Sequence, residues 1–349
     1  MRNMPIDKHS RRARPEDIRL SILEAASTNS PHLVQSVVAT FRISRQAAHR
    51  HVQGLIQEGS LVAAGKTRAR TYSLALLESR SATLHLEGTE EHQVWLDNAR
   101  GIMQSVPGSV EQMAHFCFTE IVNNSIDHSG GTMLRVIVER TALWVRMVVI
   151  DDGIGIFRKI KEALNLDDER HAMLELTKGK FTTDPSAHSG LGIYFSSKAC
   201  DEFVISSRHI GFGHVRGGAD FLIDDRPVGP DGTGVTMVIR VDSSETMGAI
   251  YARHFSPENP GFSRTTIPVA VAQYGDENLV SRSQAKRVLL RVDRFKEVIF
   301  DFAGVSFIGQ AFADEIFRVF SLTHPDVHLL AANAAPEVQA MIDLALGKE

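Results

Sequence analysis

The chain has 349 residues, of which 43% are hydrophobic and 23% are charged, and its formal net charge at pH 7 is −4. That apolar content is enough for two or three domains, each with a core of its own. No run of eighteen uncharged apolar residues occurs, no apolar stretch follows the basic amino terminus, and the two cysteines, Cys117 and Cys200, are too few for a disulfide framework. These features argue against membrane-spanning and disulfide-rich secreted classes and predict a soluble, cytoplasmic protein.

The charge is unevenly distributed along the chain. Residues 1–75 contain twelve Lys and Arg but five Asp and Glu, a net charge of +7, whereas the remaining residues carry −11. A basic segment joined to an acidic remainder favours contact with a polyanion. A solvated basic face would give the same sum, so the residue pattern has to decide.

Three helices and a hairpin are predicted between residues 15 and 74. An apolar stripe runs from Ile18 to Ala26, a short second helix covers 32–41, and Ser44 is placed to cap a third helix that Gly59 ends. The segments 61–64 and 71–74 flank a glycine turn and predict a small hairpin. This order resembles the winged helix-turn-helix family of DNA-binding domains.

That resemblance implies double-stranded DNA as a partner. The third helix would present Arg45, Gln46, His49 and Arg50 to the major groove, where Arg and Gln can read base edges. The wing would place Lys66, Arg68 and Arg70 against phosphates, which adds affinity without sequence information. A winged helix used for protein contact is the alternative. A linker is expected over residues 77–91, with a domain boundary near residue 80.

Two segments in the middle of the chain combine polar side chains with regular structure. The first, residues 119–128, has a helical apolar face, and on another face Glu120, Asn124 and His128 follow at intervals of four residues. Such groups are costly to bury without a purpose. The second is a buried-looking strand, residues 148–150, that leads into Asp151 and then Gly153 and Gly155, where backbone can approach a ligand closely.

Two further segments are rich in glycine. Residues 188–195 place Gly190, Leu191 and Gly192 at the start of a helix, and free N–H groups at a helix amino terminus favour an anion such as phosphate. Residues 231–239 form a glycine turn, containing Thr233, that leads into a strand. Each of these segments alone is more often ordinary turn chemistry than a ligand site.

Together and in this order, the four segments make residues 90–242 resemble the GHKL ATPase superfamily, whose Bergerat fold is shared by gyrase, heat-shock chaperones, histidine kinases and mismatch-repair proteins. The helix at 119–128 looks closest to the anti-sigma-factor serine kinases. The resemblance implies ATP and magnesium as cofactors. It makes Asn124 the magnesium ligand, Glu120 the catalytic carboxylate and Asp151 the acceptor for the adenine amino group. It also assigns Thr233 to a water beside Asp151, Gly153 and Gly155 to the adenine pocket, and Gly190, Leu191 and Gly192 to the phosphates.

Two parts of this region allow more than one interpretation. Residues 177–183 are polar, basic and contain Gly179, which fits a mobile lid over the triphosphate or an ordinary surface loop. His128 could be catalytic, or it could cap the end of its helix.

After a linker expected over residues 254–264, strands are predicted at 298–303 and 327–331, with helices at 310–321 and 336–346. The alternation resembles STAS-like domains, the class of anti-sigma-factor antagonists. Those antagonists carry a phosphorylated serine after the strand. Here the stretch from Phe307 to Phe312 has no hydroxyl and Ser306 is offset, so a docking or dimerising role is expected instead.

The sequence therefore predicts a multidomain α+β protein with three parts: a winged helix-turn-helix domain (1–78), a Bergerat-fold α/β sandwich (79–245) and a small STAS-like α/β domain (246–349). The predicted function is a nucleotide-regulated DNA-binding protein, a magnesium-dependent ATPase that forms a homodimer and can meet a protein partner through its STAS-like domain. The alternatives are a serine/threonine protein kinase acting on a separate partner and a nucleotide-binding scaffold without catalysis.

Overall fold

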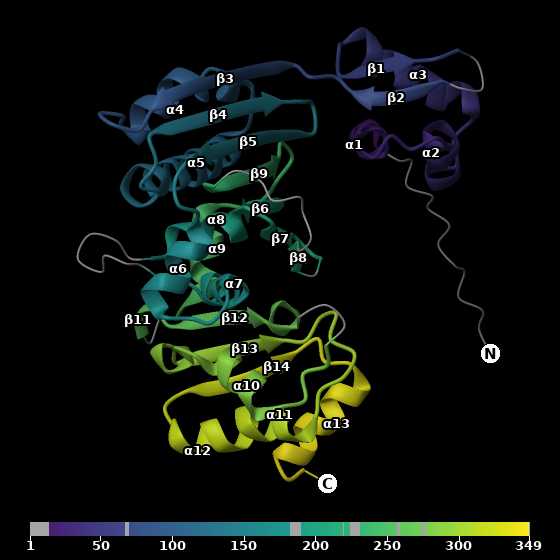
Figure 1. The fold of residues 1–349 in the computed structure, drawn as a ribbon. Helices are drawn as coiled ribbons and strands as arrows, with labels where there is room; N and C mark the ends of the chain where they lie inside the picture. Colours follow the sequence, from purple (N-terminus) through teal and green to yellow (C-terminus); the bar gives the residue numbers. More distant parts are fainter. Residues whose placement is uncertain are drawn as a thin grey trace, which may run out of the picture. The chain divides into compact units, whose positions relative to one another are not determined.

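A computed structural model describes residues 14–66, 70–181, 190–218, 220–223, 231–256, 259–273 and 277–348 (Figure 1). The chain divides into two compact units. One consists of Met1–Ser79 with Glu139–Val145, and the other of Arg80–Val138 with Arg146–Glu349. Within the described residues, no helix is long and apolar enough to cross a membrane.

The first unit has three helices followed by a hairpin, in the order expected from the sequence. The helices are α1 (Pro15–Ser27), α2 (Leu33–Phe41) and α3 (Arg45–Gln57), and strands β1 (Leu61–Ala64) and β2 (Thr71–Leu74) pair antiparallel. Helix α3 begins as predicted, because the Ser44 hydroxyl accepts a hydrogen bond from the Ala47 N–H at 3.1 Å. Gly59 has a φ of +81°, which suits a glycine just after a helix.

The core of this unit is closed by a residue that is distant in the sequence. Ile22, Val37 and Val52 are fully buried, and they belong to one apolar cluster that also takes in Leu143, from the turn between strands β4 (Met133–Arg140) and β5 (Trp144–Asp151). The first unit thus includes Glu139–Val145, which comes after strand β3 (Glu78–His85) and most of strand β4 in the sequence.

The second unit contains a seven-stranded sheet in the order β3-β4-β5-β9-β6-β7-β8. The remaining strands are β3 (Glu78–His85), β6 (Glu202–Ser207), β7 (Ile210–Val215), β8 (Phe221–Ile223) and β9 (Gly234–Arg240). Helices α4 (Glu91–Asn98), α5 (Gly108–His128), α8 (Gly192–Ala199) and α9 (Met247–His254) lie on one side of the sheet (Figure 1). Helices α6 (Ile156–Leu164) and α7 (Glu169–Lys178) pack on each other beside them.

The expectation of a linker over residues 77–91 is wrong. Strand β3 occupies most of that range as the edge strand of the sheet, and α4 begins at Glu91. An edge strand has one paired side and is half exposed, so its Ser, Arg and Glu side chains weaken the alternation that marks a strand.

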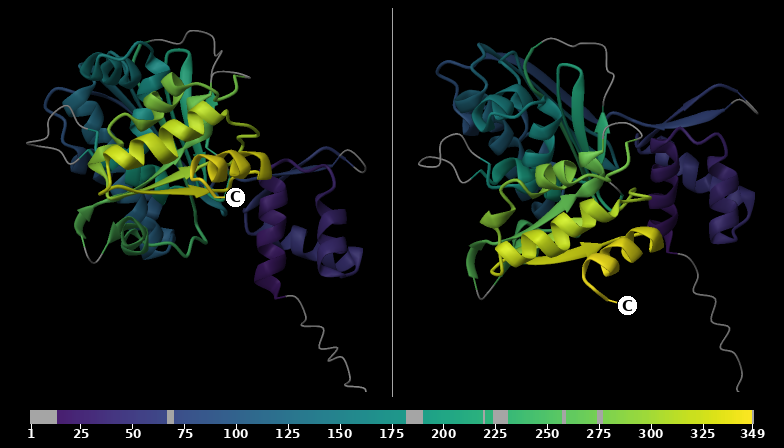
Figure 2. Two further views of the ribbon diagram at one scale, coloured as in Figure 1. Left: turned by 90° about the horizontal axis from the view of Figure 1, so that it is seen from below. Right: turned by 60° about the horizontal axis from the view of Figure 1, so that its bottom comes forward.

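The C-terminal part of the second unit is built on a parallel sheet of β12 (Arg264–Pro268), β13 (Glu297–Asp301) and β14 (His328–Ala332). Helices α10 (Arg282–Leu289), α11 (Gln310–Asp314), α12 (Ser321–Thr323) and α13 (Pro336–Ala345) flank it, as Figure 2 shows. A π-helix over Glu315–Phe320 joins α11 to α12, so the predicted helix at 310–321 is present but not regular.

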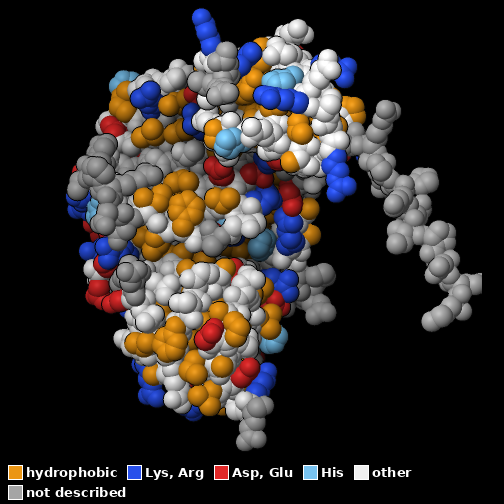
Figure 3. Space-filling view, turned by 90° about the vertical axis from the view of Figure 1, so that its right-hand side faces the viewer, with side chains coloured by type: hydrophobic (Ala, Val, Ile, Leu, Met, Phe, Trp, Pro, Cys, Tyr) orange, Lys and Arg blue, Asp and Glu red, His pale blue; other side chains and the backbone are white. Residues whose placement is uncertain are grey.

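The linker predicted over residues 254–264 is also wrong, because strands β10 (Phe255–Ser256) and β11 (Asn259–Phe262) form an antiparallel hairpin there. Phe262 is buried and packs edge-on against Tyr194 and Phe195 of α8. Hydrophobic side chains are visible on the lower part of the surface in Figure 3, which the C-terminal segment forms, and Leu322 of this segment is 74% exposed.

Candidate functional site

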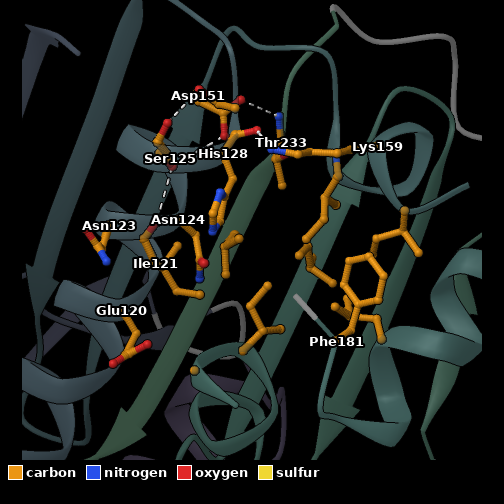
Figure 4. Close-up of a pocket in the computed structure, with 18 of the residues that line it drawn as sticks. Glu120, Ile121, Asn123, Asn124, Ser125, His128, Asp151, Lys159, Phe181 and Thr233 are labelled. Carbon is orange, nitrogen blue, oxygen red and sulfur yellow. Dashed lines mark hydrogen bonds between the residues drawn. The ribbon is translucent and has the colours of Figure 1, made fainter. Parts of the chain in front are cut away.

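A cavity of about 270 Å³ lies in the second unit, beside the helices that cover the seven-stranded sheet. This is close to the lower end of the range for small-molecule sites, about 300–1,000 Å³. Its walls come from α5, the loop after β5, α6, α7, α8 and β9 (Figure 4). It is lined by Glu120, Ile121, Asn123, Asn124, Ser125, His128, Ser129, Asp151, Ile154, Gly155, Ile156, Lys159, Ile160, Leu176, Phe181, Gly190, Gly192, Ile193, Tyr194, Ile205, Thr233 and Val235.

The Asp151 carboxylate lies at one end of this cavity. Its Oδ1 accepts hydrogen bonds from the N–H groups of Gly153 (3.0 Å) and Thr233 (3.1 Å), and its Oδ2 accepts a long one from the Ser125 hydroxyl (3.4 Å). All three donors are neutral, and burial raises the pKa of Asp151 more than these hydrogen bonds lower it. The carboxylate is therefore fixed in direction while keeping acceptor capacity for a ligand.

Helix α5 supplies the polar side chains along the length of the cavity. Glu120, Asn124 and His128 all line it, on the face that their spacing predicts (Figure 4). The Asn124 Nδ2 atom is buried and has no hydrogen-bond partner. A buried amide that is left unpaired and faces a cavity is a group that a bound ligand can satisfy.

Glycines bring the backbone close to these side chains. A Cβ atom on Gly192 would lie 2.0 Å from Glu120 Oε2, so the start of α8 can sit against that carboxylate only because residue 192 has no side chain. Gly155 has a φ of +87°, and a Cβ there would lie 2.3 Å from the Ser207 hydroxyl.

Two of the predicted cofactor-binding residues do not line the cavity. Gly153 acts through its N–H on Asp151 and packs against the Ser129 carbonyl. Leu191 is the N-cap of α8 and lies outside the lining. Thr233 lines the cavity, and besides its N–H contact to Asp151 its hydroxyl accepts a hydrogen bond from the Ile156 N–H at 3.0 Å.

Ser125 and Lys159 are among the lining residues to which the sequence pattern assigns no role, whereas Phe181 belongs to the segment predicted to be a lid or a surface loop. The Lys159 ammonium donates to the His128 carbonyl at 2.6 Å, and burial lowers its pKa. Its position on the helix that starts beside Gly155 was an available signal. Ser125 meets Asp151 only through the fold, so no local pattern could have identified it.

The segment interpreted as a lid or a surface loop is partly helical and partly buried. Residues 177 and 178 end α7, and the Lys178 side chain is fully buried. Lys178 therefore faces neither solvent nor a triphosphate. Residues 182 and 183 of the same prediction lie outside the described part of the chain.

Most of the predicted DNA-contacting residues are accessible on the first unit. Arg45, Gln46 and Arg50 are exposed on α3, and His49 is half-buried beside them. Lys66 and Arg70 are exposed at the hairpin, where the Arg70 guanidinium lies 5.6 Å from the centre of the Tyr72 ring. Arg68 lies outside the described residues.

Two family models match parts of the chain. Residues 109–245 match the model described as histidine kinase-, DNA gyrase B- and HSP90-like ATPase, and residues 284–339 match a STAS-like domain of unknown function (DUF4325). No curated protein shows a significant match to the chain. All residues that line the cavity lie within the first matched range, and most of its polar residues come from the four segments singled out in the sequence. The chain thus carries a GHKL-type ATPase domain followed by a STAS-like domain.

Proposed function

We propose that the chain binds ATP with magnesium in this cavity, hydrolyses it, and uses nucleotide occupancy to regulate DNA binding by a winged helix-turn-helix domain in its first unit. The observation that carries the proposal is the composition of the cavity. Asp151 lies at one end, Glu120 and Asn124 line it along α5, and the amino terminus of α8 faces Glu120. This set supplies an acceptor for a base, oxygen donors for a cation and N–H groups for phosphates.

The residues present fit ATP and magnesium. Magnesium prefers oxygen ligands and binds through few protein groups, which suits the carboxamide oxygen of Asn124. The Asn124 Nδ2 atom that has no partner is a hydrogen-bond donor, which a phosphate oxygen of the nucleotide would satisfy. When bound, the metal would neutralise charge on the phosphates.

The remaining chemistry belongs to two side chains and to the backbone at the start of α8. Asp151, held by neutral donors, accepts a hydrogen bond from the exocyclic amino group of adenine. The first N–H groups of α8 orient the phosphates through their dipoles. Glu120, one helical turn before Asn124, takes the proton of the attacking water, a contribution of about 10²–10⁴-fold for a positioned general base.

The DNA-binding half of the proposal is supported by helix α3 and the basic charge of residues 1–75. Arg45, Gln46 and Arg50 are exposed on one helix that Ser44 caps, and the hairpin adds Lys66 and Arg70. Regulation requires that ATP bind two arrangements of the chain with different affinities, because equal affinity would shift no population.

Binding and turnover of ATP test the first half. Asp151→Asn and Asn124→Ala should weaken ATP binding, whereas Glu120→Gln should bind ATP normally and release phosphate about 10²–10³-fold more slowly. Glu162→Gln, an exposed glutamate on α6, is the matched control. Glu120→Gln with unchanged turnover contradicts the assignment. Transfer of label from ATP to a second protein would indicate the kinase alternative instead of hydrolysis.

Duplex DNA binding with and without ATP tests the second half. We expect affinity to fall as salt rises, and Arg50→Ala to weaken binding by about 10-fold, since one good base contact is worth about 1–3 kcal/mol. Arg80→Ala, at an exposed arginine on strand β3, is the control. DNA affinity that is the same with and without ATP would contradict the coupling even if both ligands bind.

A further inference from the structure

Helix α7 and the residues that follow it lie between the cavity and the STAS-like domain. On one side, Leu176 and Phe181 line the cavity. On the other side α7 packs against β12 (Figure 1), where the Thr265 hydroxyl donates to the Lys178 carbonyl at 2.8 Å. A single stretch of chain therefore forms a wall of the nucleotide site and a contact surface of the C-terminal domain.

A buried ionic cluster fastens this stretch to the C-terminal domain. The Glu175 carboxylate, 1% exposed, accepts hydrogen bonds from Lys178 Nζ (2.5 Å) and from Arg291 Nη1 (2.9 Å). Lys178 Nζ also donates to the Leu290 carbonyl at 2.7 Å. Two cations thus share one carboxylate out of water, an arrangement that loses its compensation when any member is removed.

Arg291 makes two further contacts that reach toward the cavity. Its Nη2 donates to the Lys180 carbonyl at 2.6 Å, and its guanidinium lies 5.4 Å from the centre of the Phe181 ring. Arg291 has a left-handed backbone, with a φ of 61°, which is uncommon for a residue other than glycine, asparagine or aspartate. The local backbone therefore adopts a sparsely populated conformation where this side chain extends to Lys180 and Phe181.

The neighbouring contacts add to the attachment. Lys180 Nζ donates to the Arg294 carbonyl at 2.9 Å and lies 4.9 Å from the centre of the Phe295 ring. The Phe181 backbone is also close to Gly190, one of the glycines expected at the phosphates. A Cβ atom on Gly190 would lie 2.4 Å from the Phe181 carbonyl oxygen. Displacing residues 180 and 181 would consequently change the cavity wall where Gly190 lies.

We infer that Arg291 of the STAS-like domain is a positioning residue for the nucleotide site: it holds Phe181 in the cavity wall, so that nucleotide affinity depends on how the STAS-like domain is seated. The inference rests on the proposed ATP binding. The STAS-like domain lacks the phosphoacceptor serine of the antagonists, but Arg291 gives it another way to act. A partner bound to this domain would alter the ATP site through Arg291.

The test measures the dissociation constant for ATP with magnesium by calorimetry on the full chain, together with the melting temperature without nucleotide. Arg291→Met should weaken ATP binding about 10-fold, and Arg291→Lys about 3-fold, because lysine keeps the charge but not the planar fork that reaches two acceptors. Arg318→Met, at an exposed arginine of the same domain that pairs with Asp314, is the matched control and should bind ATP normally.

A double-mutant cycle with Phe181→Ala decides whether Arg291 acts through Phe181. If it does, the double variant should bind ATP no more weakly than the single variant with the lower ATP affinity. The effects of substitutions at two coupled residues do not add. Fold-changes in affinity that multiply would overturn the inference, as would a lowered melting temperature with unchanged affinity.

Should Arg291→Met fail to fold, Arg291→Lys answers the same question. Wild-type chain that binds no ATP would refute the proposed function itself, and an unchanged Arg291→Met affinity refutes this inference alone.

Discussion

Two buried carboxylates, Asp151 and Glu175, sit in opposite kinds of surroundings. Asp151 is held by two backbone N–H groups and one hydroxyl, all neutral. Glu175 is held by the charged side chains of Lys178 and Arg291, one on each oxygen. The first arrangement orients the Asp151 carboxylate and leaves it able to accept from a ligand. In the second, both oxygens of Glu175 are already paired with cations. Burial of a carboxylate therefore does not mark a ligand site until the charge of its hydrogen-bond donors is known.

The largest effect is expected from removing the charge of Glu175. Glu175→Gln leaves two buried cations without a counter-charge, and breaking a buried pair in this way costs about 3–5 kcal/mol of stability. Urea unfolding of the full chain measures this value. Glu162→Gln, which removes an exposed partner of Arg158, should leave stability close to that of the wild type. Equal losses in the two variants would mean that the Glu175 cluster is not structural.

The counterpart at Asp151 should affect binding rather than folding. Asp151→Asn replaces an acceptor by an amide that can turn its N–H₂ toward the adenine amino group, and we expect ATP affinity to fall about 100-fold, or roughly 2.7 kcal/mol. Calorimetric titration gives the affinity. The neighbouring Asp152→Asn is the control, since Asp152 accepts from the N–H groups of Thr132 and Met133 and does not line the cavity. Similar losses in both variants would remove the distinction drawn for Asp151.

A pH effect is expected at His254, which packs against Tyr194, Phe195 and Phe262. Its Nδ1 is 3.3 Å from the hydroxyl of Tyr194, a cavity residue, and burial together with nearby cations lowers the pKa of His254 to about 4. Because the unfolded chain binds this proton near pH 6.5, the stability due to neutral His254 is complete above that pH and is lost as pH falls toward 4. The loss between pH 7 and pH 5 should be about 1 kcal/mol after allowing for partial exposure.

Urea unfolding at these two pH values should show the loss in the wild type and a smaller one in His254→Phe. The phenylalanine keeps the ring packing against Phe195 and Phe262 but removes the titrating group. An identical pH dependence in both proteins would assign the effect to other groups.

The smallest effect is expected at Ser125. Its hydroxyl makes the longest of the three contacts to Asp151, so Ser125→Ala should weaken ATP binding by only about 2-fold, or roughly 0.4 kcal/mol. Calorimetry beside Asp151→Asn measures the ratio. A loss as large as that of Asp151→Asn would mean that the hydroxyl, and not the pair of N–H groups, orients the carboxylate.

Local patterns predicted the elements of the first unit and most of the cavity. Ser44 caps α3 as expected, and the spacing of Glu120 and Asn124 placed both on one face of α5, because helix geometry is a local property. The ionic cluster could not be predicted in this way, because its residues are brought together only by the tertiary fold. Glu175 and Arg291 are 116 residues apart, and nothing near Lys178 in the sequence shows that a strand and a loop of another domain cover it. Its polar, glycine-containing context is instead typical of a lid or a surface loop.

The place of Leu143 in the core of the first unit has a consequence for the order of folding during synthesis. Residues 15–74 leave the ribosome long before the turn between β4 and β5, so they complete their apolar cluster only after β3, α4, α5 and β4 have also been made. Until then the site of Leu143 stays open to water. The basic segment would thus reach its final stability late, at the stage when the strand leading to Asp151 is being added to the chain.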